Sequence, residues 1–208
     1  MPTDMLVPLL ASAILGYLIG SIPTGFLVVR ATTGLDVRTV GSGRTGGTNV
    51  LRAAGRNAFA LTVLGDLAKG AVSVLVARVL FGELAQLVAG FCAVLGNNWS
   101  IFLRSRGGAG VMTTVGTLLV IAPFVVLTVG WLPILLVYVT RISSIGSLVA
   151  AIAGPLWMAL LVYLGYQPLQ NLIYVLLLGA LLVVVHIPNI QRLLAGRERR
   201  IGEPVRKE

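Results

Sequence analysis

A twelve-residue segment, GSGRTGGTNVLR at residues 41–52, combines glycines with hydroxyl and guanidinium side chains. Glycine lets the backbone fold into concave turns whose N–H groups can point at an anion. Arginine adds charge and two parallel donors that match a phosphate group. A flexible linker whose arginines set membrane topology is the alternative, but the combination favours phosphate binding. The candidates in this segment are Gly41, Ser42, Gly43, Arg44, Thr48, Asn49 and Arg52.

A second segment, GNNWSIFLRSRGGAG at residues 96–110, has a similar mixture of glycines, polar side chains and cations. It passes from an apolar run through Asn97 to Arg106 and then to a glycine cluster that includes Gly107 and Gly108. Backbone N–H groups with cations nearby fit an anion site. Taken alone, the segment fits a simple turn equally well.

A third segment, HIPNIQRLLAGR at residues 186–197, begins with the only histidine of the chain. His186 fits a proton shuttle, a phosphate ligand or an ordinary interfacial residue. Asn189 and Arg192 follow at three-residue spacings, so on a helix all three side chains would share one face. The segment therefore adds a polar face to the two glycine-rich loops.

The composition shows what must position these segments. Of 208 residues, 57% are hydrophobic and 11% are charged, whereas soluble domains average about 25% charged residues. At roughly 20 apolar residues per span, the apolar runs predict an all-α integral membrane protein with one membrane domain over residues 1–208. Seven helices are expected near residues 5–29, 57–80, 84–103, 108–122, 125–140, 145–164 and 170–187. Six helices are the alternative, because Pro123 and Pro133 obscure the bounds of the fourth and fifth helices.

The distribution of basic residues predicts the orientation. Most of the 16 lysines and arginines fall in alternate connections and in the tail, which ends with Arg206 and Lys207, whereas the opposite side receives Arg78 alone. Basic residues are retained in the cytoplasm, so we expect the N-terminus outside and the tail inside. The segments at 38–57, 96–110 and 186–208 would then all face the cytoplasm. The net charge of +9 reflects this topology and attraction to anionic lipid headgroups, which argues against nucleic-acid binding.

Two polar features lie within the expected spans. Asp66 and Lys69 are three residues apart on the second helix, so we expect them to pair, either as a functional site or as a lock between helices. Ser144 and Ser147 lie near the cytoplasmic start of the sixth helix. They either join a polar cluster or bond back to their own helix, and the second is favoured, although Ser144 is retained as a candidate. A single cysteine, Cys92, excludes an intrachain disulfide.

Taken together, these segments resemble the bacterial acyl-phosphate-dependent glycerol-3-phosphate acyltransferases, the PlsY family. The family patterns are approximately GSGNxGATNVxRxxG, GHxFPxFxxFxGGKG and HxxNIxRLxxGxE. This chain has GSGRTGGTNVLRAAG, the GGxG segment and HIPNIQRLLAGRE, together with GSIPTGFLV in the first helix and GDLAKG in the second. The first and third patterns are matched well, and the resemblance covers nearly the whole chain.

The resemblance implies a seven-helix enzyme of the bacterial inner membrane, with its active site open to the cytoplasm. It would transfer a fatty acyl group from acyl phosphate to the 1-hydroxyl of glycerol 3-phosphate in phospholipid synthesis, giving lysophosphatidate and phosphate. Because acyl phosphate is already activated, no metal, cofactor or covalent intermediate is expected. The implied catalytic residues are Ser42, Arg52, His186 and Asn189. The implied substrate-binding residues are Gly41, Gly43, Arg44, Thr48, Asn49, Asn97, Arg106, Gly107, Gly108 and Ser144.

The second pattern departs from the family at three positions. Asn97 replaces the histidine, Ser100 the proline and Ala109 the lysine. In the first pattern Arg44 stands at the usual asparagine and Gly47 at the usual alanine. In one account Arg44 or Arg106 supplies the missing cation, and acyl transfer survives. In the other, the chain is a diverged paralogue that binds phosphorylated lipid precursors without catalysis, or an acyltransferase with another donor or acceptor.

Overall fold

The computed structural model describes residues 3–203, which contain helices and turns but no strand. Arg206 and Lys207, named above in the tail, lie outside this range. The chain divides into two compact units, one reaching to Ile121 and one beginning at Ala122. Each unit is an assembly of helices with its own polar segments, so each is described by itself. The prediction of a single membrane domain stays a prediction.

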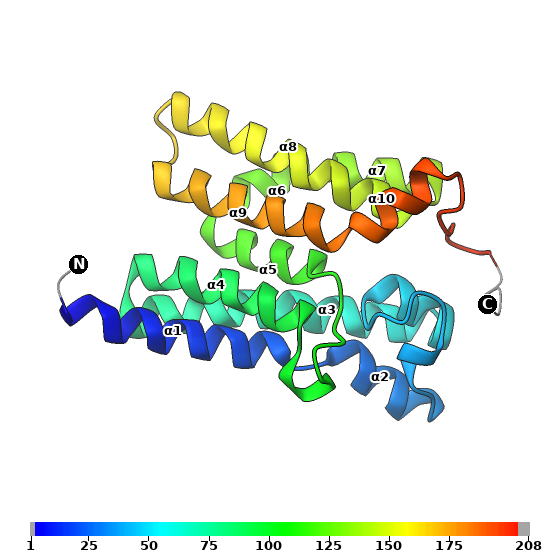
Figure 1. Cartoon of the computed structure of the whole chain (residues 1–208). Helices are drawn as coiled ribbons and strands as arrows, with labels where there is room; N and C mark the ends of the chain where they lie inside the picture. Colours follow the sequence, from blue (N-terminus) through cyan, green and yellow to red (C-terminus); the bar gives the residue numbers. More distant parts are fainter. Residues whose placement is uncertain (1–2, 204–208) are drawn as a thin grey trace. The chain divides into compact units, whose positions relative to one another are not determined.

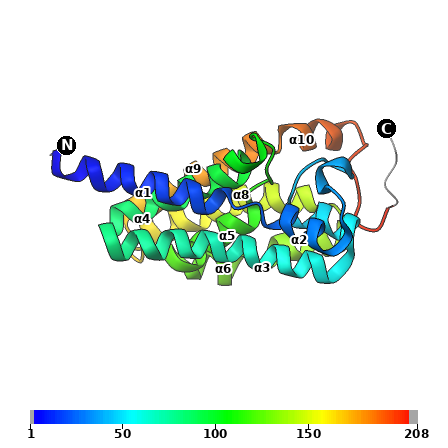
Figure 2. The same cartoon turned by 90° about the horizontal axis from the view of Figure 1, so that it is seen from below.

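The described part of the first unit, residues 3–121, contains five α-helices and two short 3₁₀ turns (Figure 1). These elements are α1 (Thr3–Ser21), α2 (Thr24–Thr33), η1 (Val37–Thr39), α3 (Gly47–Phe81), α4 (Glu83–Asn98), η2 (Ile101–Leu103) and α5 (Val111–Ile121). Helices α1 and α4 run side by side in both views (Figures 1 and 2). They approach so closely that a Cβ added to Gly20 would lie 2.0 Å from the Ala93 carbonyl oxygen. Small residues of this kind let the backbones of membrane helices pack directly.

Two predicted helices of the first unit have different bounds in the structure. The expected helix over 5–29 is interrupted at Ile22 and Pro23, because proline lacks an N–H and disfavours a helical conformation in the preceding residue. The helix expected to begin at residue 57 begins at Gly47 and contains a kink at Gly55, whose φ is 80°. The kink separates a short segment, which carries the end of the glycine-rich motif, from the long apolar part of α3.

The second unit contains α6 (Pro123–Val129), α7 (Trp131–Thr140), α8 (Ser143–Tyr163), α9 (Leu169–Val185) and α10 (Ile187–Leu194). Helices α8 and α9 pack against each other (Figure 1). The expected helix over 125–140 is two helices that meet at Gly130. Helices α9 and α10 are bent by 56° at His186, so the polar third segment starts at a change of chain direction.

Within residues 3–203, five helical stretches are long and apolar enough to cross a membrane, and the bent pair α9 and α10 makes a sixth candidate. Helix α5 is apolar but has 11 residues, which cover roughly 16 Å at 1.5 Å per residue. That is about half of the hydrocarbon core of a bilayer. Large apolar side chains are exposed along these helices, among them Ile14 and Leu64, as expected for surfaces that face lipid. The chain is therefore an all-helical integral membrane protein with five to six candidate spans.

Candidate active site

The first glycine-rich loop is held together by the side chain of Asn49, which is only 2% exposed. Asn49 lies in the first turn of α3, and its Nδ2 donates to the carbonyl oxygens of Val37, Val40 and Arg44 at 3.0, 2.9 and 2.9 Å. Its Oδ1 accepts from the backbone N–H of Ser42 at 3.1 Å. One buried amide therefore satisfies four backbone groups that a loop without regular structure would otherwise leave unpaired.

The turn around Ser42 requires glycine at position 41. Gly41 has a φ of +54°, and a Cβ added there would lie 2.4 Å from Oδ1 of Asn49 and 3.5 Å from Cδ of Arg52. The glycine thus lets the backbone lie directly against both side chains. Ser42 is exposed, and its Oγ accepts from the Arg44 N–H at 3.4 Å. Ser42 and Arg52, both predicted as catalytic, are therefore brought to the same turn.

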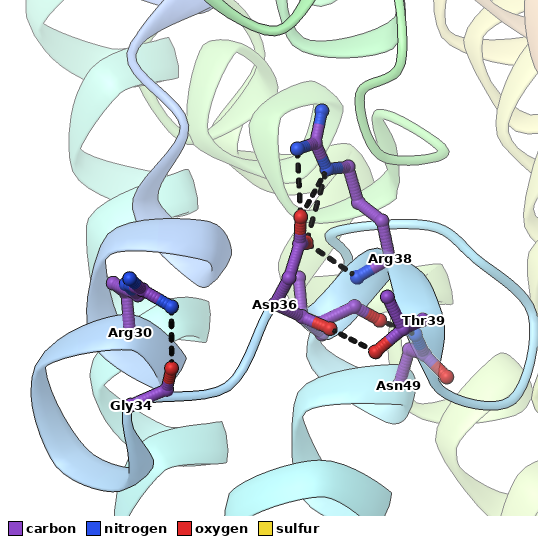
Figure 3. Close-up of polar contacts among 7 residues, drawn as sticks. Arg30, Gly34, Asp36, Arg38, Thr39 and Asn49 are labelled. Carbon is purple, nitrogen blue, oxygen red and sulfur yellow. Dashed lines mark hydrogen bonds and ion pairs between the residues drawn. The ribbon is translucent and has the colours of Figure 1, made fainter.

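The base of this loop is fixed by Asp36 and Arg38 (Figure 3). The Asp36 carboxylate accepts from the Arg38 backbone N–H at 2.9 Å and from its Nη2 at 2.7 Å. These hydrogen bonds from Arg38 hold the pKa of Asp36 below its ordinary value, and the same contact raises the pKa of Arg38. The Arg38 guanidinium also lies 5.2 Å from the centre of the Phe26 ring. These contacts therefore fix the backbone conformation of residues 36–38, just before the glycine-rich turn begins.

The second glycine-rich loop packs against the first. The Thr45 N–H donates to the Gly107 carbonyl at 3.3 Å. Gly107 and Gly108 in turn donate to the carbonyl oxygens of Asn98 and Asn97 at 3.2 and 2.9 Å. The structure thus brings together two segments whose contacting residues, Thr45 and Gly107, are about sixty positions apart in the sequence.

The predicted pair of Asp66 and Lys69 is confirmed, and it lies within a larger buried network. The Lys69 Nζ is 2.8 Å from Asp66 Oδ1, and it donates to Asn97 Oδ1 at 2.6 Å and to the Ile22 carbonyl at 3.1 Å. Thr24 Oγ1 also donates to Asp66. Asn97, which occupies the family's histidine position, therefore bonds to Lys69 through its side chain and to the second loop through its carbonyl. The network connects the break between α1 and α2 with α3, α4 and the loop.

The third polar segment, in the second unit, gathers around a residue that the sequence analysis did not single out. Glu198 accepts from Ser144 Oγ at 2.9 Å and from Asn189 Nδ2 at 2.7 Å, both at Oε1, and from Arg192 Nε at 2.7 Å at Oε2. The glutamate that ends HIPNIQRLLAGRE was the signal that could have found it.

The hydrogen bonds of Ser144 and Ser147 show which of these two serines joins the polar cluster and which bonds back to its own helix. Ser144 joins the polar cluster, whereas Ser147 bonds back to the Ser143 carbonyl at 3.1 Å, so the favoured reading holds for Ser147 and is wrong for Ser144. Asn189 and Arg192 do share a face of α10. His186 precedes that helix, is buried, and has its Nδ1 2.8 Å from the Leu182 carbonyl.

The charge state of Glu198 gives a pH prediction. Burial alone would raise the pKa of Glu198, but the hydrogen bonds from Asn189, Arg192 and Ser144 outweigh it and lower the pKa below its ordinary value of 4.5. A lowered carboxyl pKa contributes stability that is complete above pH 4.5 and is lost as the pH falls through the folded-state value. We expect hydrogen–deuterium exchange of residues 195–203, corrected for intrinsic rates, to be constant from pH 7 to 5 and to increase only below pH 4.5. The variant Glu198→Gln should exchange faster at pH 7, and loss of protection near pH 6 in the unaltered chain would contradict the account.

The remaining predicted residues are distributed as follows. Thr48 is half-buried in the first turn of α3, beside Asn49. Arg44 is half-buried within the first loop. Arg106 is exposed and lines a cavity with Arg38 and Arg104. The structure therefore brings the first and second motifs together in one unit, and joins Ser144 and Asn189 through Glu198 in the other.

Known proteins that are similar to this chain belong to the family that the motifs resemble. A glycerol-3-phosphate acyltransferase of Synechococcus sp. (strain JA-3-3Ab) is 45% identical over 93% of this chain and 94% of its own length. That of Rubrobacter xylanophilus is 44% identical over 91% and 93%. A crystal structure of the integral membrane acyltransferase PlsY in its glycerol 3-phosphate form is 35% identical, superposes with a TM-score of 0.84, and covers 93% of this chain and 96% of that one. The lysophosphatidic acid form of PlsY gives a TM-score of 0.81. The sequence profile of the family described as glycerol-3-phosphate acyltransferase matches residues 10–196, and the chain belongs to this family.

Proposed function

We propose that this chain transfers a fatty acyl group from acyl phosphate to the 1-hydroxyl of glycerol 3-phosphate, which yields lysophosphatidate and inorganic phosphate. The observation that carries the proposal is the turn at residues 41–49, in which Asn49 organises the backbone beside Ser42 and Arg52. Relatives named as glycerol-3-phosphate acyltransferases, and a related enzyme crystallised in glycerol 3-phosphate and lysophosphatidic acid forms, support it.

The chemistry needs positioning and charge stabilisation more than an activated protein nucleophile. The acceptor hydroxyl attacks the carbonyl carbon of acyl phosphate, a carbon–oxygen bond forms, and phosphate leaves with the bonding electrons. The hydroxyl proton passes to a substrate phosphate group, so no protein base is required. Ser42, in the first loop, and Arg52, in helix α3 beside it, act on the reacting groups. His186 and Asn189 are proposed as catalytic residues of the third motif.

The wider substrate-binding set combines backbone and side-chain donors. We assign to it Gly41, Gly43, Arg44, Thr48, Asn49, Asn97, Arg106, Gly107, Gly108 and Ser144. Because Asn49 and Asn97 are buried and their side chains bond within the chain, they shape the loops from inside. We also propose seven membrane passages, with the N-terminus outside and the polar segments at the cytoplasmic face, as the basic residues indicate.

We propose that Arg44 supplies the positive charge that the lysine of the family pattern would carry at the position of Ala109. A charge-assisted contact to phosphate contributes about 1.5–3 kcal/mol, so Arg44→Gln should lower kcat/KM roughly 10- to 150-fold. Ala109→Lys alone should change kcat/KM by less than about threefold, and in the Arg44→Gln background it should restore most of the loss. Steady-state kinetics of the four combinations measure this coupling. A large gain from Ala109→Lys alone, with no loss in Arg44→Gln, would contradict the assignment.

The reaction is tested by supplying purified protein in lipid with long-chain acyl phosphate and glycerol 3-phosphate. One phosphate should be released for each lysophosphatidate formed, and acyl thioesters should not replace the donor. Turnover with a thioester alone would reassign the donor. Binding of glycerol 3-phosphate without turnover on any donor would indicate the diverged paralogue that the departures at Asn97 and Ala109 suggested.

A further inference from the structure

A cavity of about 520 Å³ in the first unit combines cationic and apolar walls. It is lined by Phe26, Arg38, Phe102, Leu103, Arg104 and Arg106. None of the residues proposed as catalytic contributes to it, and Arg106 alone belongs to the proposed substrate-binding set. The cavity is therefore a separate feature of the surface near the second glycine-rich loop.

The three arginines of the cavity differ in their charge balance. Arg38 is neutralised by Asp36, which its Nε and Nη2 contact (Figure 3). The exposed guanidinium groups of Arg104 and Arg106 have no hydrogen-bond or carboxylate partner within residues 3–203. Two uncompensated positive charges thus border one cavity, which favours a ligand with two negative charges.

The backbone that carries these arginines is strained and held in place. Arg104 and Ser105 have φ values of 52° and 64°, a region that residues with a Cβ rarely adopt. The turn is fixed because Ser105 N–H donates to the Ser100 carbonyl at 2.9 Å and Arg106 N–H to the Leu103 carbonyl at 3.2 Å. Ser100 is itself anchored, its Oγ donating to the Ser21 carbonyl at 2.6 Å. The arginines are therefore presented on a preformed turn.

The apolar side of the cavity fits a lipid tail rather than a soluble anion. Phe102 is 60% exposed and its neighbour Ile101 58% exposed, directly after the end of α4. Ile101 and the exposed Trp99 lie outside the cavity lining, next to Phe102 in the sequence. Exposed aromatic and aliphatic side chains next to arginines are typical of segments at the level of lipid headgroups.

We propose that this cavity binds the singly substituted phosphate group of an acyl-bearing lipid, with the phosphate between Arg104 and Arg106 and the first part of the chain against Phe26 and Phe102. A singly substituted phosphate carries close to two negative charges at neutral pH, whereas the phosphodiester of phosphatidylglycerol carries one. Membrane phosphatidate and the acyl phosphate donor share this chemistry. In the second case the cavity holds the donor at the membrane surface before it reaches Ser42.

The binding test uses the whole purified chain in detergent and requires no turnover, so it is independent of the proposed reaction. Retention of phosphatidate, phosphatidylglycerol and phosphatidylcholine is measured by native mass spectrometry. The variant Arg104→Gln/Arg106→Gln is compared with Arg56→Gln/Arg141→Gln, which removes two exposed arginines elsewhere. We expect the first to weaken phosphatidate binding about tenfold or more, and the second to leave it unchanged. Arg104→Lys/Arg106→Lys, which retains the charges, should keep most of the binding and guards against a folding defect.

Two results would overturn the proposal. One is equal phosphatidate binding by the Arg104→Gln/Arg106→Gln variant and its control, and the other is equal binding of phosphatidylglycerol and phosphatidate by the unaltered chain. The KM values of the single variant Arg104→Gln, which leaves Arg106 of the proposed substrate-binding set intact, then identify the source of the ligand, and this arm rests on the proposed function. A raised KM for acyl phosphate with an unchanged KM for glycerol 3-phosphate indicates the donor. Unchanged KM values with weakened phosphatidate binding indicate a resident membrane lipid.

Discussion

Lys69→Met is expected to destabilise the protein by about 3–5 kcal/mol, because it leaves the buried Asp66 carboxylate without its counter-ion. Both side chains are less than one-tenth exposed, so water cannot replace the lost ammonium group. The substitution also removes the ammonium group that donates hydrogen bonds to Asn97 Oδ1 and to the Ile22 carbonyl oxygen. The measurement is the thermal unfolding midpoint of the purified protein in one detergent, with the unaltered chain alongside.

A paired substitution separates loss of the charge partner from loss of packing. Asp66→Asn/Lys69→Met removes both charges, and we expect it to recover a substantial part of the stability lost in Lys69→Met. Both variants lack the Lys69 ammonium group that bonds to the Asn97 side chain. Because the Asn97 carbonyl in turn accepts from Gly108 of the second glycine-rich loop, activity should remain low in both variants. Equal midpoints for the single and double variants would mean that the ion pair does not stabilise the fold.

Asn49→Ala should abolish most activity while leaving the helices intact. The side chain makes four hydrogen bonds to the backbone of residues 37–44, and each buried polar group left without a partner costs about 1–3 kcal/mol. The turn that carries Ser42 would therefore lose its conformation. We expect kcat/KM to fall at least about 100-fold, measured alongside the helical circular dichroism signal.

Two companion variants of Asn49→Ala make the result specific. Asn57→Ala removes an exposed asparagine from the same helix and should be close to the unaltered chain. Asn49→Asp keeps the acceptor for the Ser42 N–H but loses the donors to three carbonyl oxygens, so it should be nearly as impaired as Asn49→Ala. Activity of Asn49→Ala within threefold of the unaltered chain would contradict the role assigned to this side chain.

Local patterns in the sequence predicted those parts of the site that depend on local geometry. Glycine at position 41 indicated an unusual turn, and the structure has a positive φ there. The three-residue spacing of Asp66 and Lys69 predicted their pairing, because residues three apart are neighbours on any helix. The family motifs identified the loops, and the comparisons confirmed the family.

Contacts between distant segments could not be predicted in the same way. Nothing in the spacing of Lys69 and Asn97 indicates that they meet, because their distance depends on how α3 packs against α4. Glu198 was overlooked because an acidic residue in a basic tail looks like a solvated charge, although it binds three side chains. Hydropathy predicted seven spans, but it could not show that α5 has only 11 helical residues.

The most direct test of the central claim is acyl transfer by purified protein in lipid, with long-chain acyl phosphate and labelled glycerol 3-phosphate. The unaltered chain and the control Arg56→Ala, which removes an exposed arginine four residues from Arg52, should form lysophosphatidate. Ser42→Ala and Arg52→Ala should each lose at least about 100-fold in rate. No product from folded, unaltered protein that still binds glycerol 3-phosphate would contradict the account, as would full activity in the Ser42 and Arg52 variants.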